Sequence, residues 1–304
     1  MSQHIPAPPI TPAGPPPAPA PPAAAAPMPQ SAPPRQAPRV PAAPSAPPPP
    51  PPNARASSKT FSVNRGLKSV AHKIVIYGSG GVGKTTLASL APSPVVLDVE
   101  SGSAFIDVPR VDGINSIEDL RAALDSPEIV NGFQTIVVDS VTRVEQLLAA
   151  HVCATKRTER GDVAKSLDDY GFGKGYNALF EAFVGLLQDF ERVIARGQNL
   201  ILIAHECTTS VPNPSGNDFL RYEPLVWQAK NGNNSLRQRL KDWCDHLLYI
   251  QYDISVVDGK ARGGGSRTIY PQEGATWLAK SRSLRDPIVF AEGSDEVWRT
   301  LFRA

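Results

Sequence analysis

The run Gly78-Ser79-Gly80-Gly81-Val82-Gly83-Lys84-Thr85 is the most diagnostic part of this sequence. It has the G-x-x-x-x-G-K-T spacing of a phosphate-binding loop. The run 72–77 before it, which is apolar from Ile74 on, predicts a short buried strand, and residues 85–90 after it predict the first turns of a helix. A glycine-rich turn can match this spacing by accident, but the strand–loop–helix context favours a genuine phosphate loop.

The chemistry of such a loop assigns roles to its residues. Backbone N–H groups from Gly78 through Thr86 surround the phosphates at the start of the helix. The Lys84 ammonium reaches the β- and γ-phosphates, and the Thr85 hydroxyl is a ligand for Mg²⁺. The sequence therefore predicts a site for a nucleoside triphosphate and Mg²⁺.

The first 56 residues differ sharply in composition from the rest. They hold 23 of the chain's 32 prolines and three arginines, but no aspartate or glutamate. Because they lack the apolar and aromatic residues that form a core, we expect a disordered tail with polyproline II character. No charged segment followed by an apolar run is present, so the tail does not resemble a signal peptide. Its P-x-x-P repeats suit a proline-reading domain, but a solvated tail is the favoured interpretation.

Residues 57–304 are long enough for one large α/β domain. The chain carries a net charge of +2, and the three tail arginines account for more than this, which leaves about −1 for the domain. A nearly neutral domain binds nucleic acid only through local basic patches. No apolar run has the length of a membrane span, so we expect a soluble, cytoplasmic protein.

The cysteines do not suggest a disulfide framework, because their number is odd and their spacing is wide. Each has a histidine two positions away, but none shows C-x-x-C spacing, so a zinc site is the weaker interpretation. The pairs are His151 with Cys153, His205 with Cys207, and Cys244 with His246.

Apolar patterns predict the order of the other elements. Buried strands are expected at 94–100, 135–139 and 199–204, and helical spacing is found at 116–124, 142–154 and 179–194. Residues 246–257 and 266–270 predict a hairpin. Continuous apolar strands that alternate with helices are typical of a mostly parallel sheet covered by helices on both faces. The C-terminal hairpin would extend this α/β sheet at one edge.

Hydrolysis of a triphosphate needs a second Mg²⁺-associated carboxylate and a group that activates water. Asp139 ends an apolar strand and is the candidate for the first role, with capping of the next helix as the alternative. Glu100 follows the strand at 94–100 and is the candidate general base, with Asp98 as its rival. His205 ends the strand at 199–204, where it can contact the γ-phosphate or the attacking water, or serve only as a structural histidine.

Two cations lie on alternate positions near the C-terminus, Lys280 and Arg282. A Lys and an Arg spaced in this way resemble a paired finger that reaches the γ-phosphate of a neighbouring subunit. A solvated basic strand end is the alternative.

Two polar segments, 156–176 and 208–241, interleave cations with aromatic residues. This mixture suits single-stranded nucleic acid, because cations follow the phosphates and rings stack on the bases. Several acidic residues dilute the charge, and ordinary surface loops remain an equal alternative.

The ordered set GSGGVGKT, LDVE, VVD followed by serine, LILIAH and AKSR resembles the RecA/RadA ATPase family. The resemblance covers about 68–292 and is strongest to phage-encoded, core-only RecA-like proteins that promote single-strand annealing. It implies a RecA-like ATPase core with ATP between subunits, Glu100 as the residue that activates water, and a polar sensor where His205 stands. Histidine at the sensor and the short spacing from Lys84 to Glu100 depart from bacterial RecA.

The resemblance further implies a homo-oligomeric ring or filament, binding of single-stranded DNA by the two polar segments, and trans fingers at Lys280 and Arg282. We therefore expect an ATPase that promotes annealing or recombination in a host cytoplasm, with a single-strand-binding protein as a candidate partner. The alternative is an ATP-gated binding or loading module that hydrolyses slowly. A small-molecule kinase fits less well, because no arginine-rich lid is evident.

Overall fold

The computed structural model describes residues 71–229, 234–257 and 260–302. All of them lie within one compact unit, Arg65–Ala304. The expected tail at 1–56 and the beginning of the expected domain at 57–304 fall outside the described residues.

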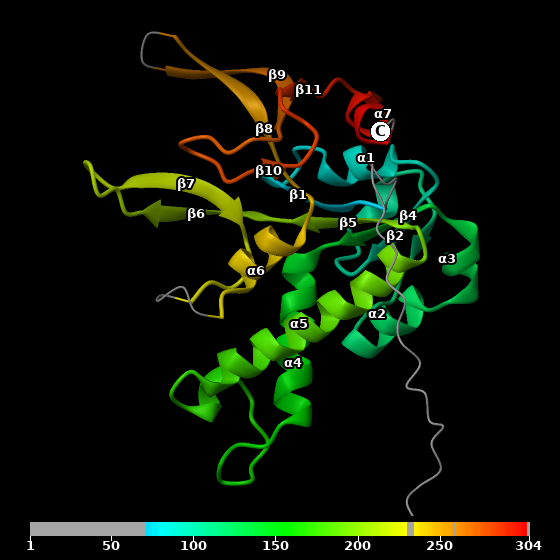
Figure 1. The fold of residues 1–304 in the computed structure, drawn as a ribbon, viewed down its shortest axis with the longest axis vertical. Helices are drawn as coiled ribbons and strands as arrows, with labels where there is room; N and C mark the ends of the chain where they lie inside the picture. The colour runs from blue at the N-terminus through cyan, green and yellow to red at the C-terminus, as the bar shows by residue number, and fades with distance from the viewer. Residues whose placement is uncertain (1–70, 230–233, 258–259, 303–304) are drawn as a thin grey trace, which may run out of the picture. The chain divides into compact units, whose positions relative to one another are not determined.

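In the described part of the chain, nine strands form one sheet in the order β11-β9-β8-β1-β5-β4-β2-β3, with β10 attached to β8 (Figure 1). The strands β1 to β5 and the start of β8 run parallel. Their bounds are Lys73–Tyr77 for β1, Pro94–Asp98 for β2, Arg110–Val111 for β3, Thr135–Asp139 for β4 and Asn199–Ala204 for β5. The antiparallel part consists of β8 (His246–Val257), β9 (Lys260–Tyr270), β10 (Lys280–Ser281) and β11 (Ile288–Val289).

Both faces of the parallel strands are buried, because successive side chains of a strand point to opposite faces. Val75 and Tyr77 of β1 join one apolar cluster, while Ile74 and Ile76 join another on the opposite face. This explains why these strands are continuous apolar runs in the sequence.

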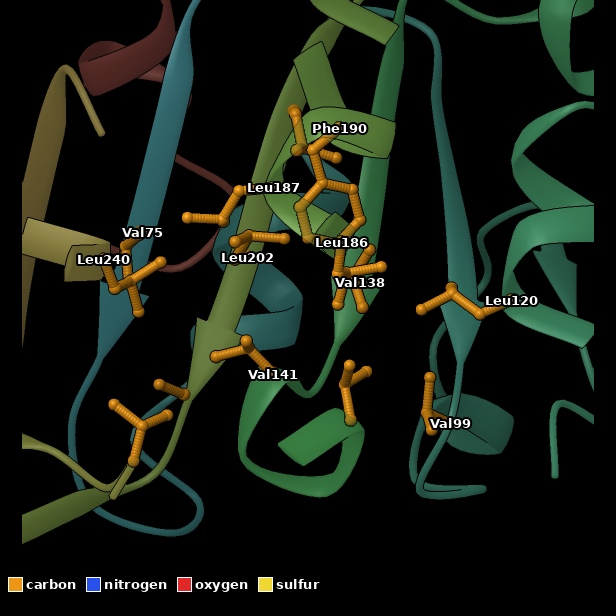
Figure 2. Close-up of a cluster of buried hydrophobic side chains, with 14 of the residues drawn as sticks. Val75, Val99, Leu120, Val138, Val141, Leu186, Leu187, Phe190, Leu202 and Leu240 are labelled. Carbon is orange, nitrogen blue, oxygen red and sulfur yellow. The ribbon is translucent and has the colours of Figure 1, made fainter. Parts of the chain in front are cut away.

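The larger apolar cluster lies between the sheet and the helices α2, α4, α5 and α6. Figure 2 shows its centre, where Val138 and Leu202 of the sheet meet Leu186 and Phe190 of α5. A fully buried phenylalanine such as Phe190 contributes about 3–5 kcal/mol by the usual cost of its truncation. The helices are α2 (Ile117–Leu124), α3 (Pro127–Gly132), α4 (Val141–Thr155), α5 (Lys174–Ala195) and α6 (Leu236–Trp243).

The opposite face is covered by α1 (Lys84–Ser89) and α7 (Glu296–Leu301). Trp298 of α7 is buried, and its indole N–H donates a hydrogen bond to the Leu87 carbonyl of α1 at 2.7 Å. Helices therefore lie on both faces of a mostly parallel sheet, which confirms the expected α/β fold class with its C-terminal hairpin.

Three local expectations were wrong. The polar segment 208–241 is not one loop: it contains most of an antiparallel ribbon, β6 (Glu206–Val211) with β7 (Phe219–Pro224), and most of α6. The segment 156–176 includes a 3-10 helix, Leu167–Tyr170, and the start of α5. The second strand of the C-terminal hairpin begins at Lys260 rather than at residue 266. The first strand ends at Val257, and the residues between the two strands lie outside the described ones. The glycines at 263–265 fall within β9: Gly263 pairs with Ile254, while Gly264 and Gly265 lie in the register shift before Arg267.

Among the described residues, no helix combines the length and the apolar character needed to cross a membrane. The parallel strands bring their carboxyl ends to one edge of the sheet, since Tyr77 pairs with Ala204 and Asp98 pairs with Asp139. The segments that carry Lys84, Glu100, Asp139 and His205 all begin at these carboxyl ends.

Candidate active site

The phosphate loop leaves β1 at Gly78 and enters α1 at Lys84. Glycine is needed at two points of this path. A Cβ on Gly78 would lie 2.1 Å from the Ile250 carbonyl oxygen, and Gly83 has a φ of +97°, in the left-handed region. The glycine spacing of the motif therefore corresponds to a close approach to β8 and to a left-handed turn before the helix.

The Lys84 side chain is buried and lies along the loop. Its Nζ donates hydrogen bonds to the carbonyl oxygens of Gly78 at 2.9 Å and Ser79 at 2.8 Å. Burial lowers the pKa of Lys84, and the carboxylates of Asp139 and Glu206 partly oppose this shift. The ammonium is thus held at the loop beside acidic residues, in position to exchange carbonyl partners for phosphate oxygens.

Thr85 and Asp139 meet at the carboxyl edge, where the Thr85 hydroxyl donates to Asp139 Oδ2 at 2.6 Å. Burial raises the pKa of Asp139, and the negative charge of Glu100 adds to that rise, while the Thr85 hydrogen bond opposes it. A nearby divalent cation would favour the ionised form of this carboxylate.

A hydroxyl and a carboxylate are hard oxygen donors that fit Mg²⁺. Within the described residues, no group of three or more His, Cys, Asp or Glu side chains is arranged to hold a metal ion. Mg²⁺ is commonly bound by one or two protein oxygens together with waters and substrate phosphates. The residues present therefore fit Mg²⁺ that arrives with the nucleotide, held by Thr85 and Asp139.

Glu100 lies two residues beyond β2 and is fastened to the end of β4. Its backbone N–H donates to the Asp139 carbonyl at 3.2 Å, and its carboxylate accepts a hydrogen bond from the Ser140 hydroxyl. His205 Nε2 lies 3.0 Å from Glu100 Oε2. The carboxylate of Glu100 is therefore held between Ser140 and His205 while remaining partly open to solvent.

Asp98, the rival of Glu100, is turned inward. It accepts hydrogen bonds from the Ser103 hydroxyl at 2.6 Å, the Ser103 N–H at 2.9 Å and the Gly102 N–H at 3.0 Å. Burial raises the pKa of Asp98, but these hydrogen bonds outweigh it and the net shift is downward. The Asp98 oxygens are thus occupied by donors at the start of the 3-10 helix Ser103–Phe105, so Glu100 is the more available base.

Sequence reasoning missed Glu206, which directly follows His205 and begins β6. Its Oε2 atom is buried and has no hydrogen-bond partner among the described residues. Burial raises the pKa of Glu206, while Lys84 and the Tyr249 hydroxyl oppose the shift. The only signal in the sequence was its place after an apolar strand, which it shares with His205.

Lys280 and Arg282 lie near the amino ends of the parallel strands, at the opposite end of the sheet from the phosphate loop. Ser281 between them pairs with His246, at the start of β8, and His246 is level with Ile74 of β1. Lys280 Nζ donates to the Lys241 carbonyl at the end of α6 at 2.6 Å, and Arg282 pairs with Asp245 at 2.9 Å. The fold does not bring these cations to the phosphate loop of their own chain, and the Arg282 side chain is 68% exposed.

The two polar segments meet each other in space. Tyr176 stacks on Trp227 with ring centroids 5.0 Å apart, and Asn234 donates to Asn177 at 3.0 Å. Some of their cations are neutralised by ion pairs, namely Lys156 with Glu181, Lys174 with Glu159, and Arg221 and Arg237 with Glu223. Arg157, Arg160, Lys165 and the fully exposed Phe172 line the free surface of the first segment.

Comparison with known proteins finds a curated relative in a prophage. The chain is 27% identical over 137 residues to the SPbeta prophage-derived uncharacterized protein YorG of Bacillus subtilis (strain 168). This match covers 43% of the chain and 40% of that protein, so it spans well under two thirds of the relative's length.

Two solved structures are similar. The KaiC-like protein PH0186 from Pyrococcus horikoshii OT3 matches with a TM-score of 0.37 and 11% identity, over 66% of this chain and 77% of that one. The flagellar accessory protein FlaH from Methanocaldococcus jannaschii matches with a TM-score of 0.35 and 12% identity, over 73% of this chain and 86% of that one.

The profile of the family described as "AAA domain" (AAA_24) matches residues 71–283, which contain the phosphate loop, Asp139, Glu100 and His205. The matched segment is most of the chain and almost all of its described sheet. The protein therefore belongs to this AAA domain family of P-loop ATPases.

Proposed function

We propose that this protein hydrolyses ATP with Glu100 as the general base. The observation that carries the proposal is the position of the Glu100 carboxylate, which Ser140 and His205 hold next to the Thr85–Asp139 pair. Glu100 accepts a proton from water as the water oxygen bonds to the γ-phosphorus and the bond to ADP breaks. Lys84 neutralises charge on the phosphates during this step, and His205 orients Glu100 or the water.

We further propose that the site is completed by a second copy of the chain. Lys280 and Arg282 lie at the opposite edge of the sheet from their own phosphate loop, so they reach a nucleotide only when it is bound by a neighbour. A head-to-tail arrangement of this kind generates a ring or a filament. An arginine supplied in trans can accelerate phosphoryl transfer by orders of magnitude.

The proposed binding partner of the two polar segments is single-stranded DNA. The contact between the two polar segments supports this, because it joins the stacked Tyr176–Trp227 pair to a surface with exposed cations and Phe172. Rings of this kind stack on bases, and cations next to them follow the phosphate backbone. With such a strand as the partner, the proposed role is annealing or recombination. The likeness to a prophage-derived protein supports only the phage-encoded origin in this proposal.

The test is the ATPase rate with and without single-stranded DNA across a range of salt concentrations. We expect stimulation by DNA that falls steeply with salt, because bound cations are released from the strand on binding. Replacing Arg157, Arg160 and Lys165 with alanine should reduce the slope of log affinity against log salt by about 2, since each lost phosphate contact changes it by about 0.7. A matched variant with Arg110, Arg285 and Arg299 replaced removes the same charge elsewhere and should retain the slope.

The second candidate function is an ATP-gated assembly or loading module. The ion pairs that neutralise Lys156 and Lys174 favour it, since they weaken the basic character of the first polar segment. This candidate predicts slow hydrolysis at a rate that single-stranded DNA does not change. A rate that is indifferent to DNA at low salt would replace the recombinase proposal with this one.

A further inference from the structure

The C-terminal hairpin touches the outer side of the phosphate loop through two side chains. The Tyr252 hydroxyl of β8 donates to the Gly81 carbonyl at 2.9 Å, and Arg267 Nη1 of β9 donates to the Val82 carbonyl at 3.3 Å. Tyr252 and Arg267 are directly opposite each other in the β8–β9 pairing. One cross-strand pair therefore contacts two consecutive carbonyls of the loop.

The β8–β9 pairing is irregular next to this pair. The β8–β9 register shifts between Tyr252 and Ile254, and such an irregularity re-aims the side chains beside it. Arg267 also stacks on Phe290, which directly follows β11, with its guanidinium carbon 4.8 Å from the ring centroid. The guanidinium is thus held by a buried ring while one of its nitrogens reaches the loop.

The loop leaves room for Arg267 because residue 83 is glycine. A Cβ on Gly83 would lie 2.6 Å from Arg267 Nη1 and 3.3 Å from a ring carbon of Phe290. The left-handed φ at residue 83 requires glycine, and the missing side chain leaves space for the guanidinium that packs there.

Together with Lys84, these residues hold four carbonyls of the loop. Lys84 takes those of Gly78 and Ser79, Tyr252 takes that of Gly81, and Arg267 takes that of Val82. In a planar trans peptide, the C=O of one residue and the N–H of the next point in opposite directions. With the Gly81 and Val82 carbonyls bonded to the hairpin, the N–H groups of Val82 and Gly83 therefore point the opposite way, and that of Val82 donates to the Ser79 carbonyl within the loop at 3.4 Å.

We infer that Tyr252 and Arg267 are positioning residues that preorganise the phosphate loop for the polyphosphate of the nucleotide. They act through the loop backbone: by holding its carbonyls they keep oxygen atoms away from the phosphates and present N–H donors to them. The inference rests on the phosphate loop being the nucleotide site, which family membership supports. It makes the C-terminal hairpin part of the nucleotide site, although Tyr252 and Arg267 follow Gly81 and Val82 by 171 and 185 residues.

The test measures dissociation constants of MgATP and of inorganic tripolyphosphate with Mg²⁺ for Tyr252→Phe and Arg267→Met. Tripolyphosphate has no base and no sugar, so it reports only on the phosphate site. Each variant should bind both ligands about three- to tenfold more weakly, because a net hydrogen bond of ordinary strength is lost from the loop. The ratio of the two affinities should not change, because both ligands use the same phosphate site.

Matched controls are Tyr270→Phe in β9 and Arg299→Met in α7, which should bind both ligands like the parent protein. Arg267→Lys retains a donor and a positive charge, so it should recover part of the affinity and serves if Arg267→Met does not fold. A loss of MgATP affinity with unchanged tripolyphosphate affinity would mean that the pair contacts base or sugar, and the inference would be wrong. Unchanged affinity for both ligands would also overturn it.

Failure of the underlying assignment has a different signature. If Lys84→Ala binds tripolyphosphate as tightly as the parent protein, the phosphate loop is not the anion site and the ATPase proposal fails with it. If Lys84→Ala loses binding while Tyr252→Phe and Arg267→Met do not, only the present inference fails.

Discussion

Glu100 and His205 face each other across the end of β4, with His205 Nε2 at 3.1 Å and 3.0 Å from the two carboxylate oxygens of Glu100. They follow β2 and β5, which are the two neighbours of β4 in the sheet. Both oxygens of the Glu100 carboxylate contact the same His205 nitrogen. A water that enters the site can therefore replace His205 at one oxygen while the other oxygen keeps its contact. The arrangement links the proposed base to the strand end from which the β6–β7 ribbon departs.

Glu100→Gln should slow ATP turnover by orders of magnitude while ATP still binds, because the amide cannot accept the proton from water. Single-turnover hydrolysis and nucleotide binding measured side by side check this. Asp98→Asn is the comparison variant: it should lower stability, since Asp98 accepts hydrogen bonds from Ser103 and Gly102, and leave the chemical step close to normal. Near-normal turnover of Glu100→Gln would move the base to another residue.

Lys84→Ala should abolish measurable nucleotide binding. The side chain supplies the positive charge inside the loop and already holds two of its carbonyls, so both attraction and loop shape are lost. Equilibrium binding of a fluorescent ATP analogue is the measurement, with Lys73→Ala, which removes an ion pair with Glu191, as a control that should bind normally. ATP affinity equal to that of the parent protein would contradict the assignment of the phosphate loop.

Mixing Lys84→Ala subunits with Arg282→Ala subunits should restore part of the ATPase activity that each lacks alone. A mixed assembly contains interfaces in which an intact phosphate loop meets an intact Arg282, as a trans finger requires. The ATPase rate is followed as a function of the mixing ratio. If assembly is intact and no activity returns, Arg282 serves only its own chain, through its ion pair with Asp245.

Acidification should destabilise the protein through His246. Burial, together with the neighbouring His72, lowers the pKa of His246 to about 4 from an ordinary value of 6.5. The unfolded chain therefore binds more protons than the folded one between these values, and the free energy of unfolding falls as the pH drops through this window. From pH 7.5 to pH 5 this histidine alone accounts for roughly 2 kcal/mol.

Urea unfolding at the two pH values measures this effect. The difference between the parent protein and His246→Gln isolates the histidine from the carboxylates, which titrate in the same range. His151→Gln is the control, because His151 lies near the surface beside Glu118. An identical pH dependence for the parent protein and His246→Gln would show that His246 does not titrate in this way.

Glu223→Gln should destabilise the protein strongly. Glu223 is 2% exposed and pairs with Arg237, which is 8% exposed, and also with Arg221. Burial raises the pKa of Glu223, but the two arginines outweigh it and lower the pKa overall, so the carboxylate is ionised. Removing one partner of a buried pair costs about 3–5 kcal/mol, because the remaining charge loses its compensation. The exposed partner of Arg221, Glu273, offers the control: Glu273→Gln should cost at most about 1 kcal/mol in the same urea experiment.

Much of the fold could be predicted from short-range patterns. The strand–loop–helix around Lys84 is specified within about fifteen residues, and the apolar runs that became β2, β4 and β5 could only be buried in a parallel sheet. Helix α5 has an apolar stripe from Leu179 to Val193 and a stop at Gly197, whose φ is +85°. In these cases local sequence and final structure agree, because the pattern has one way to bury its apolar side chains.

Local patterns were insufficient where the partner lies far away in the chain. The apolar strands place Asp98 and Glu100 at the same edge, but only packing against Ser103, Ser140 and His205 distinguishes a capping aspartate from an available glutamate. Glu206, Tyr252 and Arg267 have no motif of their own. Tyr252 and Arg267 reach the phosphate loop because β8 lies beside β1 and β9 lies beside β8, and the charge of Glu206 acts on Lys84 because Glu206 follows β5, the other neighbour of β1. Side-chain contacts across strands depend on strand order and register, which arise from the packing of the whole sheet rather than from any one segment.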